Sequence, residues 1–234
     1  MNILAIDTST SFTSIAVARN DTLAGETLFS TDRTLSARLL PEVERMLELA
    51  GLSVAEIDLF GCSTGPGSFT GVRAGVATVQ GLALATGKPC AGFSSLALLA
   101  MNIPHSPFPV CPLLDARKSE AYAGLYDCSP HLPQKMMDDC VIAPHALAEQ
   151  LLQLAERPVL FLGDGAVRYR EELTGLMGER ALFAADSCTR SRASNGILLA
   201  RHIHERGESV PPDRLLPSYI RPSEAELNRR ATTV

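Results

Sequence analysis

Apolar residues along the chain occur in short runs between polar turns and in stretches with helical spacing. In the first half, the runs predict strands at residues 2–6, 12–18, 23–29, 57–62 and 90–92. The spacing over residues 35–50 predicts an amphipathic helix despite Pro41, and Gly51 stands where such a helix ends. A helix of small residues is expected after Thr70, and a short apolar helix up to Met101.

The same order of elements begins again after a proline-rich stretch. Pro104, Pro107 and Pro109 favour an extended connection between two halves. The second half predicts strands at residues 110–114, 121–126, 140–142 and 159–162, and helices at 144–154, 167–176 and 194–205. Both halves follow the order strand, strand, strand, helix, strand, helix. We expect an α/β protein of two duplicated lobes with mixed sheets, at residues 1–103 and 109–207, and an extended tail at 208–234.

Polar residues stand at the strand ends that would face a cleft between the lobes. The candidate nucleotide-binding residues there are Asp7, Gly65, Gly67, Ser68, Asp115, Gly163 and Gly165. A strand, a glycine turn and a helix N-terminus aim N–H groups at an anion, which suits a phosphate. The alternative is a tight connection without a ligand, because the Gly-Lys-Ser/Thr ending of a P-loop is missing.

The helix after the glycine turn at residues 65–68 has almost no polar face. Gly71, Gly75 and Gly81 carry no side chain, so another backbone can approach this helix closely. A helix that is apolar all round is buried either in its own lobe or by a partner. The sequence leaves both alternatives open at this point.

Composition and charge narrow the function classes. The chain of 234 residues has 46% hydrophobic residues, a formal net charge of -5 and a pI near 5.6. This charge argues against nucleic-acid binding without help, so any role on RNA would need a basic partner. The six cysteines form no Cys-x-x-Cys pair, which is typical of reduced thiols in a cytoplasmic protein. No membrane-length apolar run and no export signal is recognisable, so we expect a soluble cytoplasmic protein without membrane contact.

Several phrases of the sequence occur together in one known family. They are Ile6-Asp7-Thr8-Ser9, Leu39-Leu40-Pro41, Gly65-Pro66-Gly67-Ser68-Phe69-Thr70-Gly71-Val72-Arg73, Leu114-Asp115-Ala116-Arg117 and Pro217-Ser218-Tyr219-Ile220-Arg221. In this order and over nearly the whole chain, they resemble the TsaB family of bacterial tRNA threonylcarbamoyladenosine biosynthesis proteins. The resemblance implies an actin-like, Hsp70-like ATPase (ASKHA) fold of two ribonuclease-H-like lobes, which agrees with the duplication.

The resemblance also implies a role without catalysis. TsaB is a degenerate paralogue of TsaD, the metal-dependent subunit that transfers a threonylcarbamoyl group to the adenosine following the anticodon of tRNAs reading codons that begin with A. The chain would be a scaffold and activating subunit for TsaD, with TsaE as third member. It would form a homodimer when alone and would meet tRNA only through the complex. No cofactor would be required, and binding of ADP or ATP stays open.

The histidine positions argue against a metal site. TsaD carries an Asn-His-x-x-x-His helix, and the corresponding place here reads Phe93-Ser94-Ser95-Leu96-Ala97-Leu98-Leu99. His202 and His204 are two positions apart on a predicted helix and therefore point in different directions. The other histidines occur singly. We expect neither metal ligands nor catalytic residues.

The resemblance makes the first-lobe helices the expected partner surface, because the family's homodimer and its complex with TsaD both use them. The candidate interface residues are Leu35, Leu39, Val43, Met46, Gly71, Gly75, Val79 and Leu82. Many members carry histidine where Leu35 stands. We expect Gly75→Leu or Gly81→Leu to weaken TsaD binding while the fold stays intact. The alternative is that both helices only cover their own sheet.

Two other functions are compatible with parts of the sequence. A kinase of the sugar-kinase or acetate-kinase kind would use Asp7 and Asp115 as magnesium ligands for Mg-ATP. The chain is short for such an enzyme, because a substrate lobe would have to be added to two ATPase lobes. A peptidase is sometimes attached to the family by name, yet Ser68 has no assignable base.

Overall fold

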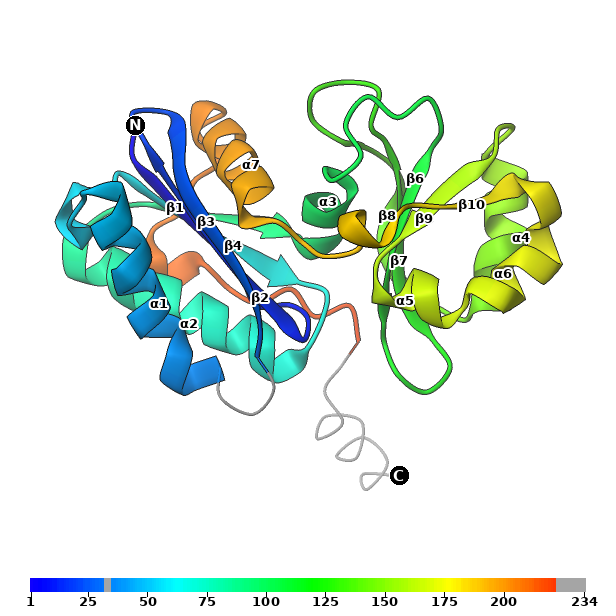
Figure 1. The fold of residues 1–234 in the computed structure, drawn as a ribbon, viewed down its shortest axis with the longest axis horizontal. Coiled ribbons are helices and arrows are strands. Elements are labelled where there is room, and N and C mark those ends of the chain that lie inside the picture. Colours follow the sequence, from blue (N-terminus) through cyan, green and yellow to red (C-terminus); the bar gives the residue numbers. More distant parts are fainter. Residues whose placement is uncertain (32–34, 222–234) are drawn as a thin grey trace.

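The structure, a computed structural model, describes residues 1–31 and 35–221 of the chain. These residues form two lobes that lie side by side, each built on a five-stranded mixed sheet covered by helices (Figure 1). The expected α/β fold of two duplicated lobes is therefore confirmed.

The first sheet has the strand order β3-β2-β1-β4-β5. Its strands are β1 Ile3–Asp7, β2 Phe12–Arg19, β3 Thr22–Ser30, β4 Leu59–Gly65 and β5 Cys90–Ser94. The central strand β1 pairs antiparallel with β2 and parallel with β4. Its alternate residues face opposite sides of the sheet, with Leu4 and Ile6 in one core cluster and Ile3 and Ala5 in another.

Helices cover both faces of this sheet (Figure 1). On one face lie α1 Leu35–Ala50 and α2 Phe69–Thr86, and on the other lies α7 Ala193–Glu205. The apolar stripe of α1 packs into the core through Leu39, Val43 and Met46, with Pro41 inside the helix. Helix α7 approaches the sheet closely because small residues meet there, and Gly196 lies against Phe93. The helix predicted at residues 35–50 is confirmed, because α1 has the same bounds.

The second sheet has the order β10-β9-β6-β7-β8. Its strands are β6 Val110–Asp115, β7 Ala121–Asp127, β8 Gln134–Ile142, β9 Val159–Leu162 and β10 Ala181–Phe183. Its helices are α4 Pro144–Leu154, α5 Asp164–Arg168 and α6 Arg170–Met177. Starting from β8, the order repeats that of the first sheet, so β6 takes the place of β1 and β9 that of β4. The duplication predicted from the sequence is present in the topology.

Three elements of the second lobe differ from the sequence prediction. Strand β10 was not predicted, since its three half-buried residues show no alternation and depend on parallel pairing with β9. The strand expected at residues 140–142 is the end of the longer β8. The helix expected at 167–176 is divided into α5 and α6 at Tyr169.

Two helices pack on a lobe that the sequence order does not indicate. Helix α3 Ser95–Ala100 contributes Leu96, Leu99 and Ala100 to a core cluster with residues of β6 and β7. Helix α7, which follows the second lobe, packs on the first sheet, where Glu26 accepts a hydrogen bond from the Ser194 N–H at 2.9 Å. The boundaries expected at residues 1–103 and 109–207 therefore do not separate the packing of the lobes, because α7 covers the first sheet and α3 also contributes Leu98 to the first-lobe core.

After α7 the chain returns along the first lobe as an extended segment, residues 208–221, which we call the C-terminal strap. Val210 exchanges two backbone hydrogen bonds of 2.8 Å with Cys90 at the start of β5. Figure 1 shows the strap in orange, running across the first lobe toward the second. Residues 222–234 of the expected tail lie outside the described residues.

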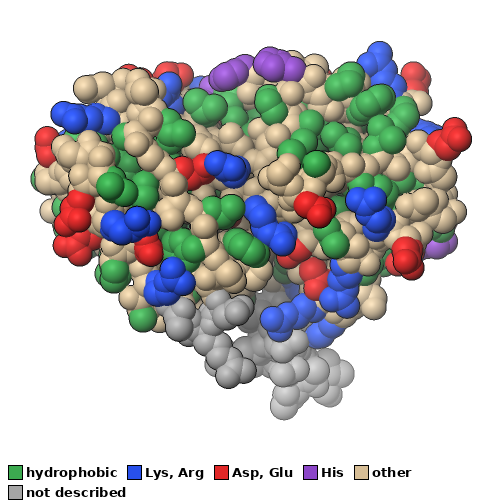
Figure 2. Space-filling view, in the orientation of Figure 1, with side chains coloured by type: hydrophobic (Ala, Val, Ile, Leu, Met, Phe, Trp, Pro, Cys, Tyr) green, Lys and Arg blue, Asp and Glu red, His purple; other side chains and the backbone are tan. Residues whose placement is uncertain are grey.

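The surface charges, the cysteines and the helix lengths bear on the environment of the chain. Basic and acidic side chains are interspersed on the face shown in Figure 2. All six cysteines are free thiols and four are buried, as expected for packed, reduced residues. In the described part of the chain, no helix combines the length and the apolarity needed to cross a membrane.

Candidate functional site

The glycine turn after β4 is closed by the chain's own backbone. Ser68 caps α2, since its Oγ accepts a hydrogen bond from the Gly71 N–H at 3.3 Å. The Ser68 N–H itself donates to the Ser9 carbonyl oxygen at 2.7 Å. A Cβ atom on Gly67 would collide with that same carbonyl group. The turn therefore uses glycine to let the β1–β2 loop approach.

The next two glycines of α2 face the same loop. A Cβ atom on Gly71 would collide with the Thr8 carbonyl oxygen, and one on Gly75 with Thr8 Oγ1. The Thr8 hydroxyl donates to the Gly71 carbonyl oxygen at 2.8 Å. The close approach expected for this helix thus occurs inside its own lobe, so the expectation that Gly75→Leu leaves the fold intact is wrong. Gly81, by contrast, has open space around its Cβ position.

The C-terminal strap closes the turn from another side. Gly65 has φ +114°, a value that favours glycine, and a Cβ atom there would meet the Ser218 carbonyl oxygen at 2.8 Å. The Ser218 N–H donates to the Thr64 carbonyl oxygen at 2.7 Å. The places around the turn where a phosphate would be held are thus lined by contacts of the chain with itself.

Asp7 lies at the end of β1 and is 1% exposed. Its Oδ1 accepts hydrogen bonds from the Ser63 hydroxyl and from the Ser9 N–H at 3.1 Å. Among the described residues, Oδ2 has no hydrogen-bond partner. Burial raises the pKa of Asp7, while the bonds from Ser63 and Ser9 act in the opposite direction. The site therefore disfavours the charged form of this carboxyl group.

Asp115 occupies the equivalent place at the end of β6 but is neutralised by an arginine. Arg168 Nη1 lies 2.8 Å from Asp115 Oδ2, and the Arg117 N–H donates to Oδ1 at 3.0 Å. The Asp115 N–H donates to Asp164 Oδ1 at 3.1 Å, and burial raises the pKa of Asp164. Arg168 thus takes the position of a counter-ion next to this carboxylate.

Gly163 and Gly165 are also engaged within their own lobe. Gly163 has φ +102°, and a Cβ atom on it would collide with the Leu113 carbonyl oxygen of β6. A Cβ atom on Gly165 would lie 3.0 Å from the Leu113 carbonyl carbon. These glycines allow the start of α5 to pack on β6, which is a structural use.

The ASKHA fold implies a magnesium nucleotide between the lobes, and the residues present do not fit one. Asp7 is 1% exposed, so its unpartnered Oδ2 is out of reach of a hydrated cation, and the Asp115 carboxylate is paired with Arg168. Within residues 1–31 and 35–221, no group of three or more His, Cys, Asp or Glu side chains could hold a metal ion. The cleft-facing residues therefore do not form a site for a magnesium nucleotide.

The eight candidate interface residues fall into two sets. Six are buried inside the first lobe: Leu39, Val43, Met46, Gly71, Gly75 and Val79. Leu35 and Leu82 are partly buried against the same core. On α1 and α2, the side chains left free toward solvent include those of Leu40, Leu49 and Leu84, and Gly81 of α2 is exposed as well. A partner on these helices would meet these exposed residues and not the six buried candidates.

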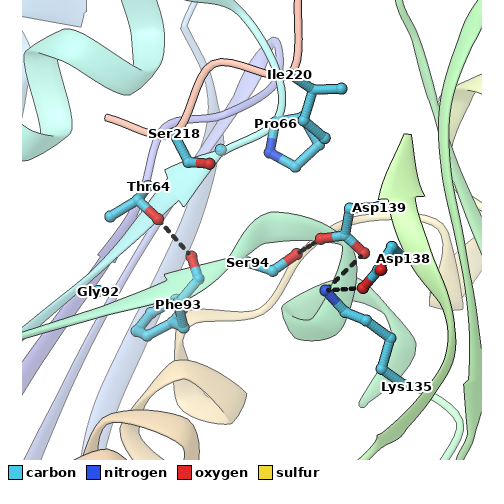
Figure 3. A pocket seen from close by; sticks show the side chains of 11 residues that line it. Thr64, Pro66, Gly92, Phe93, Ser94, Lys135, Asp138, Asp139, Ser218 and Ile220 are labelled. Carbon is cyan, nitrogen blue, oxygen red and sulfur yellow. Dashed lines mark hydrogen bonds and ion pairs between the residues drawn. The ribbon is translucent and has the colours of Figure 1, made fainter. Parts of the chain in front are cut away.

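A polar pocket of about 350 Å³ lies where the two lobes meet near the glycine turn (Figure 3). Asp139 of β8 accepts a hydrogen bond from the Ser94 hydroxyl at 2.5 Å and another from Tyr126. Lys135 Nζ lies 3.6 Å from Asp139 Oδ1 and 3.8 Å from Asp138 Oδ1. Asp139 therefore ties the second lobe to the end of β5. Sequence reasoning missed it, because no motif marks a residue whose partners come from two lobes.

Comparisons with known proteins agree with this architecture. Residues 29–203 match the family model described as TsaD, tRNA N6-adenosine threonylcarbamoyltransferase. The tRNA threonylcarbamoyladenosine biosynthesis protein TsaB of Bacillus subtilis is 32% identical over 97% of this chain and 96% of its own length. TsaB of Escherichia coli is 30% identical over 94% of this chain and 95% of its own.

Solved structures support both the family and the fold. YeaZ from Pseudomonas aeruginosa superposes with a TM-score of 0.82 at 30% identity, covering 93% of this chain and 99% of that protein. A ROK hexokinase from Thermus thermophilus reaches a TM-score of 0.53 at 12% identity over 88% of this chain and 100% of its own, which is a likeness of ASKHA fold alone. The near-complete coverage of its relatives, together with the duplicated lobes, shows that this chain belongs to the TsaB family of tRNA threonylcarbamoyladenosine biosynthesis proteins.

Proposed function

We propose that this chain is the non-catalytic subunit that binds and activates TsaD, with TsaE as third member, in the transfer of threonylcarbamoyl to the adenosine following the anticodon. The observation that carries the proposal is the closure of the cleft-facing residues by the chain itself. Asp7 is sealed by serines, Asp115 is paired with Arg168, and the glycine turn is packed against Ser9 and Ser218. These groups hold the lobes in shape, so a catalytic use would require them to give up existing contacts.

The outward face of α1 and α2 supports binding of a partner. Leu40, Leu49 and Leu84 are all more than half exposed on these two helices. Leu40 and Leu49 lie on opposite flanks of the buried stripe of α1, and the bare backbone at Gly81 lets a second helix approach α2 one turn before Leu84. Exposed apolar side chains next to a small residue suit a helix-to-helix contact. The same face serves a second copy of this chain when TsaD is absent, which gives the homodimer.

The charge of the chain supports an indirect role on tRNA. A net charge of -5 lacks the electrostatic footprint that binding to the phosphate backbone needs. The tRNA is therefore bound mainly through the complex. No nucleotide cofactor is required by this subunit, and the kinase alternative loses its support because it needs Asp7 and Asp115 as free magnesium ligands.

Reconstitution tests the proposal. The purified chain is expected to modify no tRNA and to hydrolyse ATP only at background rate. It is expected to restore modification when mixed with TsaD, TsaE, ATP, bicarbonate, threonine and the enzyme that makes threonylcarbamoyl-adenylate. Full modification without this chain, or robust ATP turnover by this chain alone, would contradict the proposal.

A pair of glycines locates the partner surface in the same assay. Gly81 of α2 and Gly175 of α6 both have open space around their Cβ positions, so leucine fits at either without disturbing the fold. We expect Gly81→Leu to weaken TsaD binding at least about tenfold by steric exclusion, and Gly175→Leu to leave it unchanged. Binding is measured by titration and by the mass of the complex. Equal binding by both variants would place the partner surface elsewhere.

A further inference from the structure

The C-terminal strap runs alongside α2 in the opposite direction. Gln80 Nε2 donates to the carbonyl oxygens of Pro212 at 3.0 Å and of Leu215 at 2.9 Å. Two helical turns earlier on the same face of α2, Arg73 Nε donates to the Tyr219 hydroxyl at 2.6 Å. These bonds fix the strap at two points along α2, at Arg73 and at Gln80. The strap and α2 therefore present one continuous surface.

An arginine and two aromatic rings form a cluster where the strap meets the first turn of α2. The rings of Phe69 and Tyr219 stack with centroids 5.2 Å apart, and Arg73 Cζ lies 3.9 Å from the centroid of the Phe69 ring. Phe69 is nevertheless 39% exposed and Tyr219 43% exposed. The cluster is thus held in one arrangement by its inner contacts, while its outer side is free. Leu216, between the two anchor points, is 66% exposed.

We propose that the strap and α2 together form one docking surface for TsaD, in which Leu216 and Tyr219 contact the partner. This inference rests on the proposed function, which places TsaD on α1 and α2. Its support is continuity, because the strap lies directly beside the helix face that carries Gly81 and Leu84. Aromatic rings, an arginine and exposed leucine are the side chains enriched at interface centres. Ordered side chains also lose little conformational entropy on binding.

The strap connects this surface to the second lobe. Arg221 Nη1 donates to the Ala116 carbonyl oxygen at 2.8 Å, and its Nη2 pairs with Glu120. Both partners belong to the turn between β6 and β7, next to Asp115. A partner that rests on Leu216 and Tyr219 therefore touches an element fastened to both lobes. The docking surface spans the first lobe but is positioned in part by the second.

A matched pair of leucines tests the inference. Leu216→Glu introduces a charge on the strap, and Leu154→Glu introduces the same charge on α4 of the second lobe, where Leu154 is 47% exposed. We expect Leu216→Glu to weaken TsaD binding at least about tenfold and Leu154→Glu to leave it unchanged. Circular dichroism and thermal unfolding should match the unaltered chain for both. Tyr219→Ala should weaken binding similarly, and Tyr219→Phe, which keeps the ring, should restore most of it.

The outcomes separate the two proposals. If Gly81→Leu weakens binding while Leu216→Glu and Tyr219→Ala bind normally, the strap is not part of the surface and only this inference fails. If Gly81→Leu also binds normally, the α2 surface itself is wrong, and both proposals lose their interface. If Leu154→Glu weakens binding as much as Leu216→Glu, the effect is one of charge alone and the inference is overturned.

Discussion

The two lobes repeat one topology but close their cleft-facing ends by different means. In the first lobe, Asp7 is buried and the loop that follows it is packed against the glycines of α2. In the second lobe, Asp115 remains partly exposed and its charge is balanced by Arg168. Equivalent aspartates at the ends of β1 and β6 thus meet opposite environments, one dry and one ionic.

This difference shows that topology places a residue while packing decides what the residue does. The strand order puts both aspartates at the same kind of sheet edge. In the first lobe, the strap and the glycines of α2 cover the sheet edge where Asp7 lies. In the second lobe, Arg168 of α5 reaches the sheet edge where Asp115 lies. Three substitutions test the comparison, beginning with the largest expected effect.

The close approach of α2 to the β1–β2 loop should be the most sensitive feature of the first lobe. We expect Gly75→Leu to lower the free energy of unfolding by about 2 to 4 kcal/mol, because its Cβ atom would overlap Thr8 Oγ1. Urea denaturation measures the loss. Gly81→Leu on the same helix is the control and should change stability by less than about 1 kcal/mol. Equal stability of the two variants would show that the Thr8 loop yields and that the first lobe is not closed this way.

Asp7 should make the stability of the chain depend on pH. Burial raises the pKa of Asp7 above its ordinary value of 3.8, so the folded chain binds this proton more tightly than the unfolded chain. The stabilisation is fully present below the unfolded pKa and is lost as pH rises through the folded pKa. Asp7→Asn removes this loss.

The expected result is therefore a stability advantage of Asp7→Asn over the unaltered chain that widens as pH rises. Urea unfolding followed from about pH 4 to 8 measures it. A stability deficit of Asp7→Asn that grows as pH rises would mean that Asp7 is stabilised in its charged form.

The ion pair of the second lobe should have the smallest effect. Arg168 is about half exposed, so its pairing with Asp115 is screened by solvent and salt. We expect Arg168→Ala to cost about 0.5 to 1 kcal/mol at low salt and close to nothing at about 1 M salt. Arg168→Lys keeps the positive charge and should therefore retain part of the stability that Arg168→Ala loses at low salt. A loss that salt does not change would indicate that the guanidinium acts by packing instead of by charge.

Much of the fold could be predicted because local patterns carry it. The spacing of Leu39, Val43 and Met46 indicated α1 with its observed bounds. The repeated order of elements indicated the duplicated lobes. Strand β10 could not be predicted, since it depends on pairing with β9. The packing of α7 and α3 could not be predicted either, since α7 packs on a sheet distant in sequence and α3 contributes to the cores of both lobes.

The candidate site shows the same limit. The sequence placed Asp7 and Asp115 at equivalent strand ends, and the structure confirms those places. The sequence did not indicate that Arg168 would pair with Asp115, that Gly75 would face Thr8, or that the strap would lie against Gly65. Each of these contacts joins residues from separate elements, so no local spacing records it.

By itself, the sequence determined most of the elements, their duplicated order and membership of the TsaB family, because periodicity and motif order are properties of neighbouring residues. Only the tertiary structure decided which glycines are used inside the first lobe and which remain open on its surface. The physical reason is that a glycine's role depends on the atoms that approach it. For Gly75 those atoms come from Thr8, 67 positions away in the sequence, and for Gly81 the space is open.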